Sequence, residues 1–591
     1  MAGPTDSLPP TALVRMFARE LAAGRATWFS LPGGTRLFEA GEDADQFYLL
    51  RAGRLGAFRP AAGRAPSFLG VIRPGEPVGE TALIVGTRHT ATVAALRDSE
   101  LLALSRDDFF ELVETDPSVM TEVARLALLR ARQLFFGGGV SAPSAFGLVS
   151  LSRSVRARDL AGALAARMSE GGWRVATVGS EAMFAPTEWF SNVERDNDFV
   201  LYAAEAEESA WSHAVDRQVD RLLQLVDADD APPPTVADVP LEPMAASQLM
   251  DLVIVQAEGA QAPTGAEAWI EALAPARHFQ LRRGDAGDLA RIARVLTSQS
   301  VGLVLSGGGA RAYAHVGVIR ALRERGVPID FVGGVSMGAI IGAGVAMGWG
   351  DDELDARIRK AFVETSPLDD ISLPLVAMTR GDKVRERLAE HFGERTIPDL
   401  WLPFFCLSTN LTTAAYELHR TGLVREALRA SVALPGLLPP VTVGKNVLVD
   451  GAVLKNFPTD VMRSIQLGPI VGVDVGRARS IEADDVRAPD SVWRWLVSGE
   501  WRRGPPIVSV LIRAATIRGE PEVLAAREAA DVLIEPDIEA IEIRDWKAYD
   551  RAVDSGYRGA MQVLDRLDRP VIDLRRPPQP QLASRKASAG G

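Results

Sequence analysis

Short apolar runs and helical periodicities divide the chain into three stretches of different pattern. Between residues 27 and 105 the apolar runs are strand-like and separated by Gly and Pro, as in DQFYLLRAGRLGAF and APSFLGVIRPGEPVGE. Alternation with frequent turns is typical of a small β-barrel or sandwich. Helical patterns at 11–23 and 106–136 flank these runs. We therefore predict a first domain over residues 10–136, an N-terminal β-barrel of jelly-roll type with flanking helices.

The second stretch, residues 146–300, alternates strand-like runs with helical ones, which is the α/β pattern. Its apolar runs are FGLVSLS, WRVATVG, DFVLYAA, RLLQLVD and MDLVIVQ. A linker over 137–145, marked by three consecutive glycines, precedes it. The chain has no Gly-x4-Gly-Lys-Ser/Thr motif. We therefore expect an α/β middle domain that is degenerate and has no phosphate loop.

The third stretch, residues 301–475, opens with VGLVLSGGGARAYAHVGVIRALRERGVPIDFVGGVSMGAIIGAGVAMGW. This segment has the pattern strand, glycine turn, helix, strand, Gly-Ser turn, helix, which predicts a second α/β domain with a central, mostly parallel sheet. Residues 476–575 should form a mostly helical extension, with DVLIEPDI as a further strand and a helix over 546–567. The polar, Pro-rich tail at 576–591 is expected to be disordered.

Composition narrows the class of protein. A length of 591 residues allows three to four domains at roughly 150 residues each. The formal net charge of -12 argues against a general nucleic-acid binder. The single cysteine, Cys406, lies in an apolar run and should be a small buried hydrophobe. No Cys/His cluster has metal-ligand spacing, so no metal site is expected.

Targeting signals and membrane spans are not apparent in the sequence. The N-terminus has no basic start followed by an apolar block, so we expect no signal peptide. The segment that comes closest to a spanning helix is 331–349, but it is rich in Gly and better suited to burial inside a protein. We expect a cytoplasmic protein, with peripheral contact with the inner face of a membrane left open.

The glycine-rich turn SGGGARA admits two functional interpretations. Gly307-x-Gly309-x-x-Ala312 formally matches the dinucleotide-binding fingerprint, but Asp330 precedes the next strand instead of ending it. The second interpretation is that successive glycines converge their N–H groups before a helix N-terminus and hold the oxyanion of an acyl-transfer intermediate. Arg311 would then add positive charge or anchor the loop. A plain strand-to-helix turn would need only one or two glycines, so we favour the oxyanion hole.

Ser336 is the candidate nucleophile. Gly334 and Gly338 complete a Gly-x-Ser-x-Gly pentapeptide between a strand and a helix. In such an elbow the small neighbours let the backbones approach, and the helix dipole favours negative charge at the serine. The pentapeptide also arises by chance in Gly-rich chains. Its position 27 residues after Gly309 (336 − 309) favours the catalytic interpretation.

A serine nucleophile needs a base, and no histidine has the expected position. The six histidines are His89, His213, His278, His315, His391 and His419. The first three precede the catalytic stretch, the fourth sits in the helix after the glycine turn, and the last two lie in polar stretches. Asp450, in NVLVDGAVLKNFP, ends an apolar strand and is followed by Gly451 and Ala452. A carboxylate there could accept the hydroxyl proton directly, although turn aspartates are also common.

Taken together, four segments resemble the blocks of patatin-like phospholipases. They are GLVLSGGGARAYAHVGVIRAL, VGGVSMGAIIGA, RASVALPGLLPPV and VLVDGAVLKNFP, in the family's order. The resemblance implies a Ser336–Asp450 dyad without histidine. It also implies an oxyanion hole formed by Gly307, Gly308 and Gly309 with Arg311. The sequence departs from the pattern at Ala312, Ala452 and Lys455, which belong to the rim of the site and not to its nucleophile or base.

The segment RPGEPVGETALIVGTRHTATVAALRDSELLALS resembles the phosphate-binding cassette of cyclic-nucleotide-binding domains. In that family a Gly-Glu pair begins a short helix, and an arginine pairs with the cyclic phosphate. Gly79 and Glu80 match, but His89 stands at the arginine position and Arg88 comes one residue early. The candidate nucleotide-binding residues are Gly79, Glu80, Arg88, His89 and Thr90. The alternative is a sensor that no longer binds a nucleotide and serves as an interaction domain.

The order of the three domains resembles bacterial relatives of neuropathy target esterase, and FSNVERDNDFVLYAAEAEESAWSHAVDRQVDRLLQLV resembles the middle part of that family. The resemblance implies a serine acyl hydrolase that cleaves fatty-acyl esters of membrane-derived lipids such as lysophospholipids. No cofactor would be required, and a cyclic nucleotide is a candidate regulator. The alternative is a catalytically impaired scaffold that binds lipid or a cyclic nucleotide. The sequence leaves head-group preference and oligomeric state open.

Overall fold

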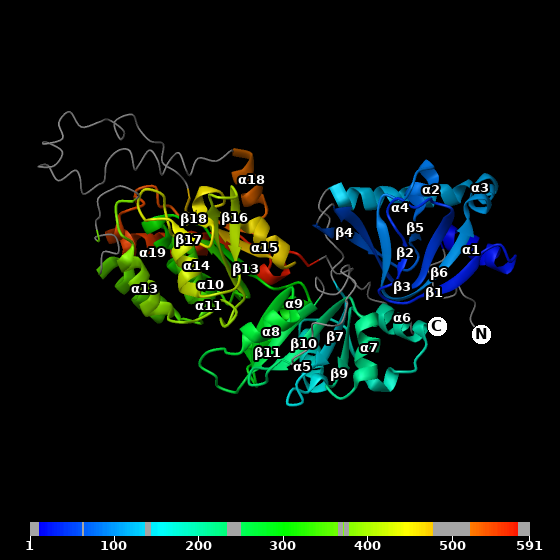
Figure 1. Cartoon of the computed structure of the whole chain (residues 1–591), viewed down its shortest axis with the longest axis horizontal. Helices are drawn as coiled ribbons and strands as arrows, with labels where there is room; N and C mark the ends of the chain where they lie inside the picture. Colours follow the sequence, from blue (N-terminus) through cyan, green and yellow to red (C-terminus); the bar gives the residue numbers. More distant parts are fainter. Residues whose placement is uncertain are drawn as a thin grey trace, which may run out of the picture. The chain divides into compact units, whose positions relative to one another are not determined.

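The computed structural model describes residues 11–61, 64–135, 143–232, 250–364, 370, 377–476 and 520–576. The chain forms two compact units, Met1–Leu296 and Thr297–Gly591 (Figure 1). Residues 137–142 of the expected linker, 477–519 of the expected helical extension and 577–591 of the expected disordered tail lie outside the described residues.

The first unit begins with a six-stranded antiparallel sheet, in the order β1-β6-β3-β4, with β2 beside β6 and β5 beside β3. Its strands are β1 (Thr27–Leu31), β2 (Arg36–Phe38), β3 (Gln46–Ala61), β4 (Arg64–Ile72), β5 (Pro77–Val78) and β6 (Thr92–Ser105). Its helices are α1 (Ala12–Ala22), α2 (Glu80–Val85), α3 (Arg106–Thr115) and α4 (Pro117–Phe135). The rings of Phe47 and Phe109 stack 4.2 Å apart where the helices meet the sheet. The predicted barrel with flanking helices is confirmed.

The same unit continues with a wholly parallel sheet in the order β12-β11-β10-β7-β9-β8. Its strands are β7 (Ala145–Ser150), β8 (Val175–Val178), β9 (Phe199–Ala204), β10 (Arg221–Asp227), β11 (Met250–Gln256) and β12 (Arg277–Arg282). Its helices are α5 (Ala157–Glu170), α6 (Thr187–Asp196), α7 (Ser209–Gln218), α8 (Ala266–Leu273) and α9 (Ala286–Leu296). The five apolar runs form the first five strands, because strands of a parallel sheet that is covered on both faces are rich in apolar residues. β12 was not predicted because arginine, histidine and glutamine interrupt its apolar pattern.

Buried ion pairs join the barrel to the parallel sheet within this unit. Arg54 of β3 pairs with Asp220, and Arg97 of β6 pairs with Glu194. Asp220 also accepts the backbone N–H of Ser144 at 2.9 Å, so the carboxylate fixes the start of β7. Removing one partner of such a pair leaves an uncompensated buried charge, which is strongly destabilising.

The second unit is built on an eight-stranded sheet, in the order β17-β18-β15-β14-β13-β19-β20, with β16 beside β15. Its strands are β13 (Gly302–Leu305), β14 (Phe331–Val335), β15 (Phe404–Asn410), β16 (Ala415–His419), β17 (Val441–Val443), β18 (Asn446–Asp450), β19 (Ile470–Val473) and β20 (Val532–Ile534). Strands β13, β14, β15, β19 and β20 are parallel, and β16 to β18 run antiparallel to their neighbours. The predicted central, mostly parallel sheet is confirmed.

Helices cover this sheet. They are α10 (Ala314–Glu324), α11 (Met337–Ala346), α12 (Asp351–Arg359), α13 (Asp382–Phe392), α14 (Val424–Ser431), α15 (Thr459–Ile465), α18 (Glu520–Glu528) and α19 (Tyr549–Leu564). All ten residues of α11 are buried, which explains why its sequence is apolar on every face.

Residues 520–575, part of the mostly helical extension that the sequence predicts over 476–575, pack into the second unit. β20 adds a parallel strand to β19, and α19 packs against α10. The helices approach so closely that a Cβ on Gly317 would lie 1.9 Å from the carbonyl oxygen of Val553. The two helices therefore meet at glycines that no other residue can replace without a shift.

Candidate active site

Ser336 directly follows β14 in a strained backbone conformation, with φ 55° and ψ −130°. A non-glycine residue with positive φ is uncommon, and such strain clusters at active sites. Gly338 is required at this turn, since a Cβ there would lie 2.5 Å from the carbonyl oxygen of Ser306. Gly334 is equally crowded, with its Cβ position 2.8 Å from the backbone of the same turn. Ser336 therefore lies at the start of α11 at a tight strand-to-helix turn, and its role as a nucleophile stays a prediction.

The segment after α14 holds both members of the candidate dyad in place. The hydroxyl of Ser431, at the end of α14, accepts the backbone N–H of Ser336 at 3.0 Å. Two residues further on, the carbonyl oxygen of Ala433 accepts the backbone N–H of Asp450 at 2.9 Å. Both interactions come from the sequence block RASVALPG, for which the sequence alone suggested no role.

The strand arrangement brings Asp450 to Ser336. β15 pairs with β14 up to Val335↔Leu407 and with β18 from Ser408↔Asp450 onward. Since β16 occupies the other edge of β15, β18 enters on the edge where β14 ends. The last residue of β18 therefore meets the first residue after β14.

The two side chains form a direct hydrogen bond. Ser336 Oγ donates to Asp450 Oδ2 at 2.7 Å, and Asp450 Oδ1 accepts the backbone N–H of Ala452 at 2.8 Å. Asp450 is 1% exposed. A carboxylate within hydrogen-bond distance of a hydroxyl has the geometry of a nucleophile and its base.

The glycine loop lies against the nucleophile, but its three N–H groups are not equivalent. A Cβ on Gly307 would lie 3.0 Å from Ser336 Cβ. The Gly307 N–H donates to Asn456 Oδ1 at 3.0 Å, and Asn456 Nδ2 donates back to the Gly307 carbonyl oxygen at 3.0 Å. Within the described part of the chain, the N–H groups of Gly308 and Gly309 donate to no acceptor. The candidate oxyanion donors are therefore the N–H groups of Gly308 and Gly309. The Asn456 side chain clamps Gly307 through both of its backbone polar groups.

Arg311 anchors the loop through a buried contact with the backbone. Its guanidinium is buried and donates through Nε to the carbonyl oxygen of Ile541 at 2.6 Å. The backbone N–H of Ala310 also ties the loop to this segment, donating to the carbonyl oxygen of Ile543 at 2.8 Å. Of the two roles that the sequence left open for this arginine, the structure favours the anchor.

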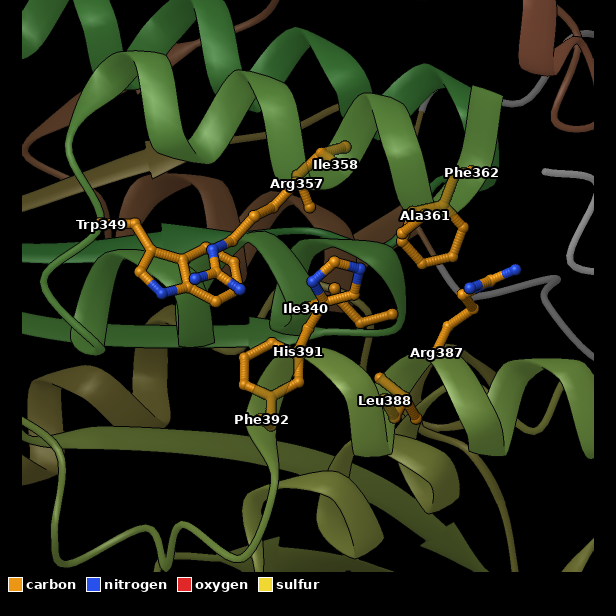
Figure 2. Close-up of a pocket in the computed structure, with 10 residues that line it drawn as sticks. All are labelled: Ile340, Trp349, Arg357, Ile358, Ala361, Phe362, Arg387, Leu388, His391 and Phe392. Atoms are coloured by element: carbon orange, nitrogen blue, oxygen red, sulfur yellow. The ribbon is translucent and has the colours of Figure 1, made fainter. Parts of the chain in front are cut away.

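The three histidines of the second unit lie in three different surroundings, and His315 packs in the helix after the glycine turn as the sequence suggested. His315 is fully buried in α10, where Nε2 contacts the carbonyl oxygen of Ser306 at 2.8 Å and burial lowers the pKa of its ring to about 4. His391 lies in a small, mostly apolar pocket (Figure 2) that contains neither member of the dyad. His419 lies on β16, and its Nε2 contacts the Ser408 hydroxyl at 2.8 Å. The sequence set His419 aside because it lies in a polar stretch, and only the sheet brings it to Ser408, the register partner of Asp450.

The pocket in Figure 2 is walled by α11, α12, α13 and the short segment Lys360–Glu364. Its lining residues are Ile340, Trp349, Arg357, Ile358, Ala361, Phe362, Arg387, Leu388, His391 and Phe392. Arg357 stacks over Trp349 at 4.8 Å, so its charge is already engaged.

In the described structure the two candidate cations of the nucleotide site, Arg88 and His89, are engaged in other contacts. Arg88 is 70% exposed and pairs with Asp43 through Nε at 3.1 Å, whereas His89 is buried and stacks on Phe38 with ring centres 3.6 Å apart. Burial lowers the pKa of His89, which leaves the ring neutral at neutral pH. Gly79 and Glu80 begin α2 as expected, and Thr90 is exposed. These residues do not fit the charge of a cyclic phosphate.

The middle sheet carries its own carboxylate where a phosphate would bind. β7 lies between β9 and β10, at the switch of strand order where α/β sheets bind ligands. The backbone N–H groups of Ala157 and Arg158, at the start of α5, both donate to Glu205 at 3.1 Å. Glu205 therefore occupies the helix N-terminus that holds anions in phosphate-binding folds.

Two negative findings concern the described residues. Among them, no group of three or more His, Cys, Asp or Glu side chains is placed to hold a metal ion. In the same part of the chain, no helix is both long enough and apolar enough to cross a membrane.

Comparisons with known proteins agree with the three-part architecture. Three family models match: the cyclic nucleotide-binding domain over residues 28–116, the neuropathy target esterase (NTE) family P-loop like domain over 176–283, and patatin-like phospholipase over 303–463.

Similar proteins include an uncharacterized NTE family protein of Mycobacterium tuberculosis (strain CDC 1551 / Oshkosh), 31% identical over 90% of this chain and 91% of that protein. Patatin-like phospholipase domain-containing protein 6 of Mus musculus is 28% identical over 90% of this chain and 44% of its own length. Lysophospholipase nte1 of Neosartorya fischeri is 25% identical over 95% of this chain and 43% of its own length.

Proposed function

The chain belongs to the neuropathy target esterase family, and on that premise we propose that it is a serine acyl hydrolase of the lysophospholipase or esterase class, cleaving fatty-acyl esters of membrane-derived lipids. The patatin-like domain makes a lipid hydrolase the expected activity. The observation that supports the mechanism is the 2.7 Å hydrogen bond from Ser336 to Asp450, at a strained elbow beside two N–H groups without partners in the described chain.

In the proposed reaction Asp450 accepts the hydroxyl proton while Ser336 Oγ attacks the ester carbonyl carbon. The N–H groups of Gly308 and Gly309 stabilise the oxyanion, which is the role of preorganised backbone donors in acyl transfer. Collapse breaks the ester bond, and Asp450 gives its proton to the departing alcohol oxygen. Asp450 then takes a proton from water as the water oxygen attacks the acyl-enzyme carbonyl carbon. The bond from that carbon to Ser336 Oγ breaks, Asp450 returns the proton to Oγ, and the fatty acid leaves. No cofactor enters the scheme.

The test is product analysis with matched variants. Wild type, Ser336→Ala and Asp450→Asn are incubated with a lysophosphatidylcholine, and the free fatty acid is quantified. We expect release by wild type only, at least a thousandfold above either variant, with melting temperatures that show intact folds. A catalytically impaired scaffold would instead give no release by wild type and no covalent labelling of Ser336 by a fluorophosphonate.

Contact with a lipid surface is a further part of this proposal. Five apolar side chains on the strands and turns next to Asp450 in the chain or the sheet, which we call the apolar rim, are between 37% and 57% exposed: Leu411, Tyr416, Leu418, Val443 and Leu454. They lie on the β15–β16 and β17–β18 hairpins and just after Asp450. Exposed apolar groups gathered on one part of a surface mark interaction sites.

Two lysines accompany the rim. Lys445 is exposed in the β17–β18 turn. Its backbone carbonyl oxygen accepts a hydrogen bond from the Thr412 hydroxyl of the neighbouring hairpin at 3.3 Å. Lys455 Nζ stands over the Tyr416 ring at 5.4 Å and pairs with Asp460. Apolar groups beside an exposed lysine such as Lys445 suit a bilayer surface that contains anionic lipid.

This contact is tested by co-sedimentation with phosphatidylcholine vesicles, with and without phosphatidylglycerol. The double variant Leu411→Gln/Val443→Gln should bind several-fold less, and the control Leu524→Gln, 49% exposed on α18, should bind like wild type. Equal binding by the double variant and wild type would reject the rim as the docking surface.

The barrel is proposed to act as an interaction domain without a cyclic nucleotide. This assignment rests on the outward Arg88 and the neutral, stacked His89. Titration with cAMP or cGMP should leave the melting temperature and the esterase rate unchanged up to millimolar ligand. A saturable shift with either nucleotide would contradict it.

A further inference from the structure

A buried polar pair lies behind the candidate base. Ser408 of β15 is fully buried, and its hydroxyl contacts His419 Nε2 on the neighbouring strand β16 at 2.8 Å. Burial lowers the pKa of His419, although nearby Glu417 partly opposes that shift. Buried polar side chains in a sheet are hydrogen-bonded because an unpaired group costs about 1–3 kcal/mol. The pair is thus satisfied internally, and the reaction scheme above gives it no task.

The sheet register places Ser408 directly beside Asp450. The two residues are opposite partners in the antiparallel pairing of β15 with β18. Side chains at opposite positions project from the same face, with Cβ atoms roughly 4.5–5.5 Å apart. His419 reaches that same face from the other edge of β15, where its strand pairs through Cys406↔His419. The four side chains are therefore neighbours in the order His419, Ser408, Asp450 and Ser336, and each comes from a different segment.

The chemistry of these groups defines what the pair can do. A serine hydroxyl has one rotatable hydrogen and two acceptor positions, so its direction depends on its partner. A neutral imidazole that donates Nε2–H to Ser408 Oγ turns the hydroxyl hydrogen away from the ring. Asp450 has its Oδ1 held by the Ala452 N–H and its Oδ2 bonded to Ser336. A third polar neighbour would restrict rotation of the carboxylate out of that geometry.

We propose that Ser408 and His419 are positioning residues of the dyad: His419 orients the Ser408 hydroxyl, which holds the Asp450 carboxylate against Ser336. The inference rests on the proposed serine hydrolase function. It explains why a histidine lies in this catalytic unit without touching the nucleophile. The imidazole acts on the carboxylate through one hydroxyl, whereas in a catalytic triad it contacts the serine directly.

The test uses Ser408→Ala, Ser408→Thr and His419→Gln on a short nitrophenyl ester and on fluorophosphonate labelling. Ser408→Ala should lower kcat and the labelling rate constant about tenfold, with KM within twofold, since substrate binding is untouched. Ser408→Thr keeps the hydroxyl and should recover most of the rate. His419→Gln should lower kcat between threefold and tenfold. Rates are expressed per labelled site, so loss of folded protein does not mimic the effect.

The matched control is Glu417→Gln, because Glu417 is exposed on the same strand and also pairs with Ser408 in register. It should stay within twofold of wild type. Ser408→Ala with wild-type kcat, or Ser408→Thr as slow as Ser408→Ala, would overturn the positioning role. If Ser408→Ala does not fold, the kcat of His419→Gln, on the exposed strand β16, tests the positioning role by itself. A wild type that neither hydrolyses nor labels refutes the hydrolase itself, which is a different outcome.

Discussion

The clamp between Asn456 and Gly307 gives the sharpest test of the oxyanion loop. Asn456→Ala removes both 3.0 Å hydrogen bonds and leaves the buried Gly307 N–H and carbonyl groups without their side-chain partner. Leaving a buried polar group unpaired costs about 1–3 kcal/mol. If the loop shifts to recover that loss, Gly308 and Gly309 no longer face the developing oxyanion. At about 1.4 kcal/mol per tenfold in rate, kcat should fall roughly 5-fold to 150-fold.

The assay is hydrolysis of a soluble nitrophenyl ester, with fluorophosphonate labelling to count active sites. KM should change little, because the loop stabilises charge that exists only in the transition state. Asn456→Asp keeps the acceptor but loses the donor and adds negative charge beside the loop, so it should be at least as slow. Lys455→Ala is the neighbouring control, since that side chain contacts Asp460 and Tyr416. An Asn456→Ala enzyme with wild-type kcat would refute the reasoning.

Three further outcomes are expected. Gly317→Ala should lower the melting temperature by several degrees or prevent folding, because its Cβ would lie 1.9 Å from the Val553 carbonyl oxygen; an unchanged melting curve would contradict this packing. Burial disfavours the Asp251 carboxylate, but Arg277 and Arg221 outweigh burial and hold its pKa below the ordinary value. The stabilisation is therefore complete above about pH 3.9 and is lost as pH falls through the lower, folded-state pKa, so Asp251→Asn should flatten the acid limb of a stability–pH curve. Ser336→Ala should abolish fluorophosphonate labelling without changing the circular dichroism spectrum.

Local pattern was sufficient for most elements of the fold. The apolar runs of the middle sheet became strands because a parallel strand is buried on both faces and needs no polar alternation. The sequence did not predict β12 because two of its buried residues are polar. Arg277 pairs with Asp251, and Gln280 accepts a hydrogen bond from Gln256. Local pattern did not place the C-terminal region in the sheet. A three-residue strand such as β20 is not stable alone and forms only by pairing with β19.

The sequence by itself determined the elbow at Ser336 and the strand end at Asp450, because a Gly-x-Ser-x-Gly turn and an apolar run followed by Asp-Gly dictate backbone conformation over a few residues. Only the tertiary structure decided which groups those residues meet. The Gly307 N–H is taken by Asn456, 149 positions away, and Arg311 by Ile541, 230 positions away. The position of His419 behind the dyad likewise depends on the register of β16 and β18 against β15. Hydrogen-bond partners of this kind follow from strand order and register, which short-range periodicity does not encode.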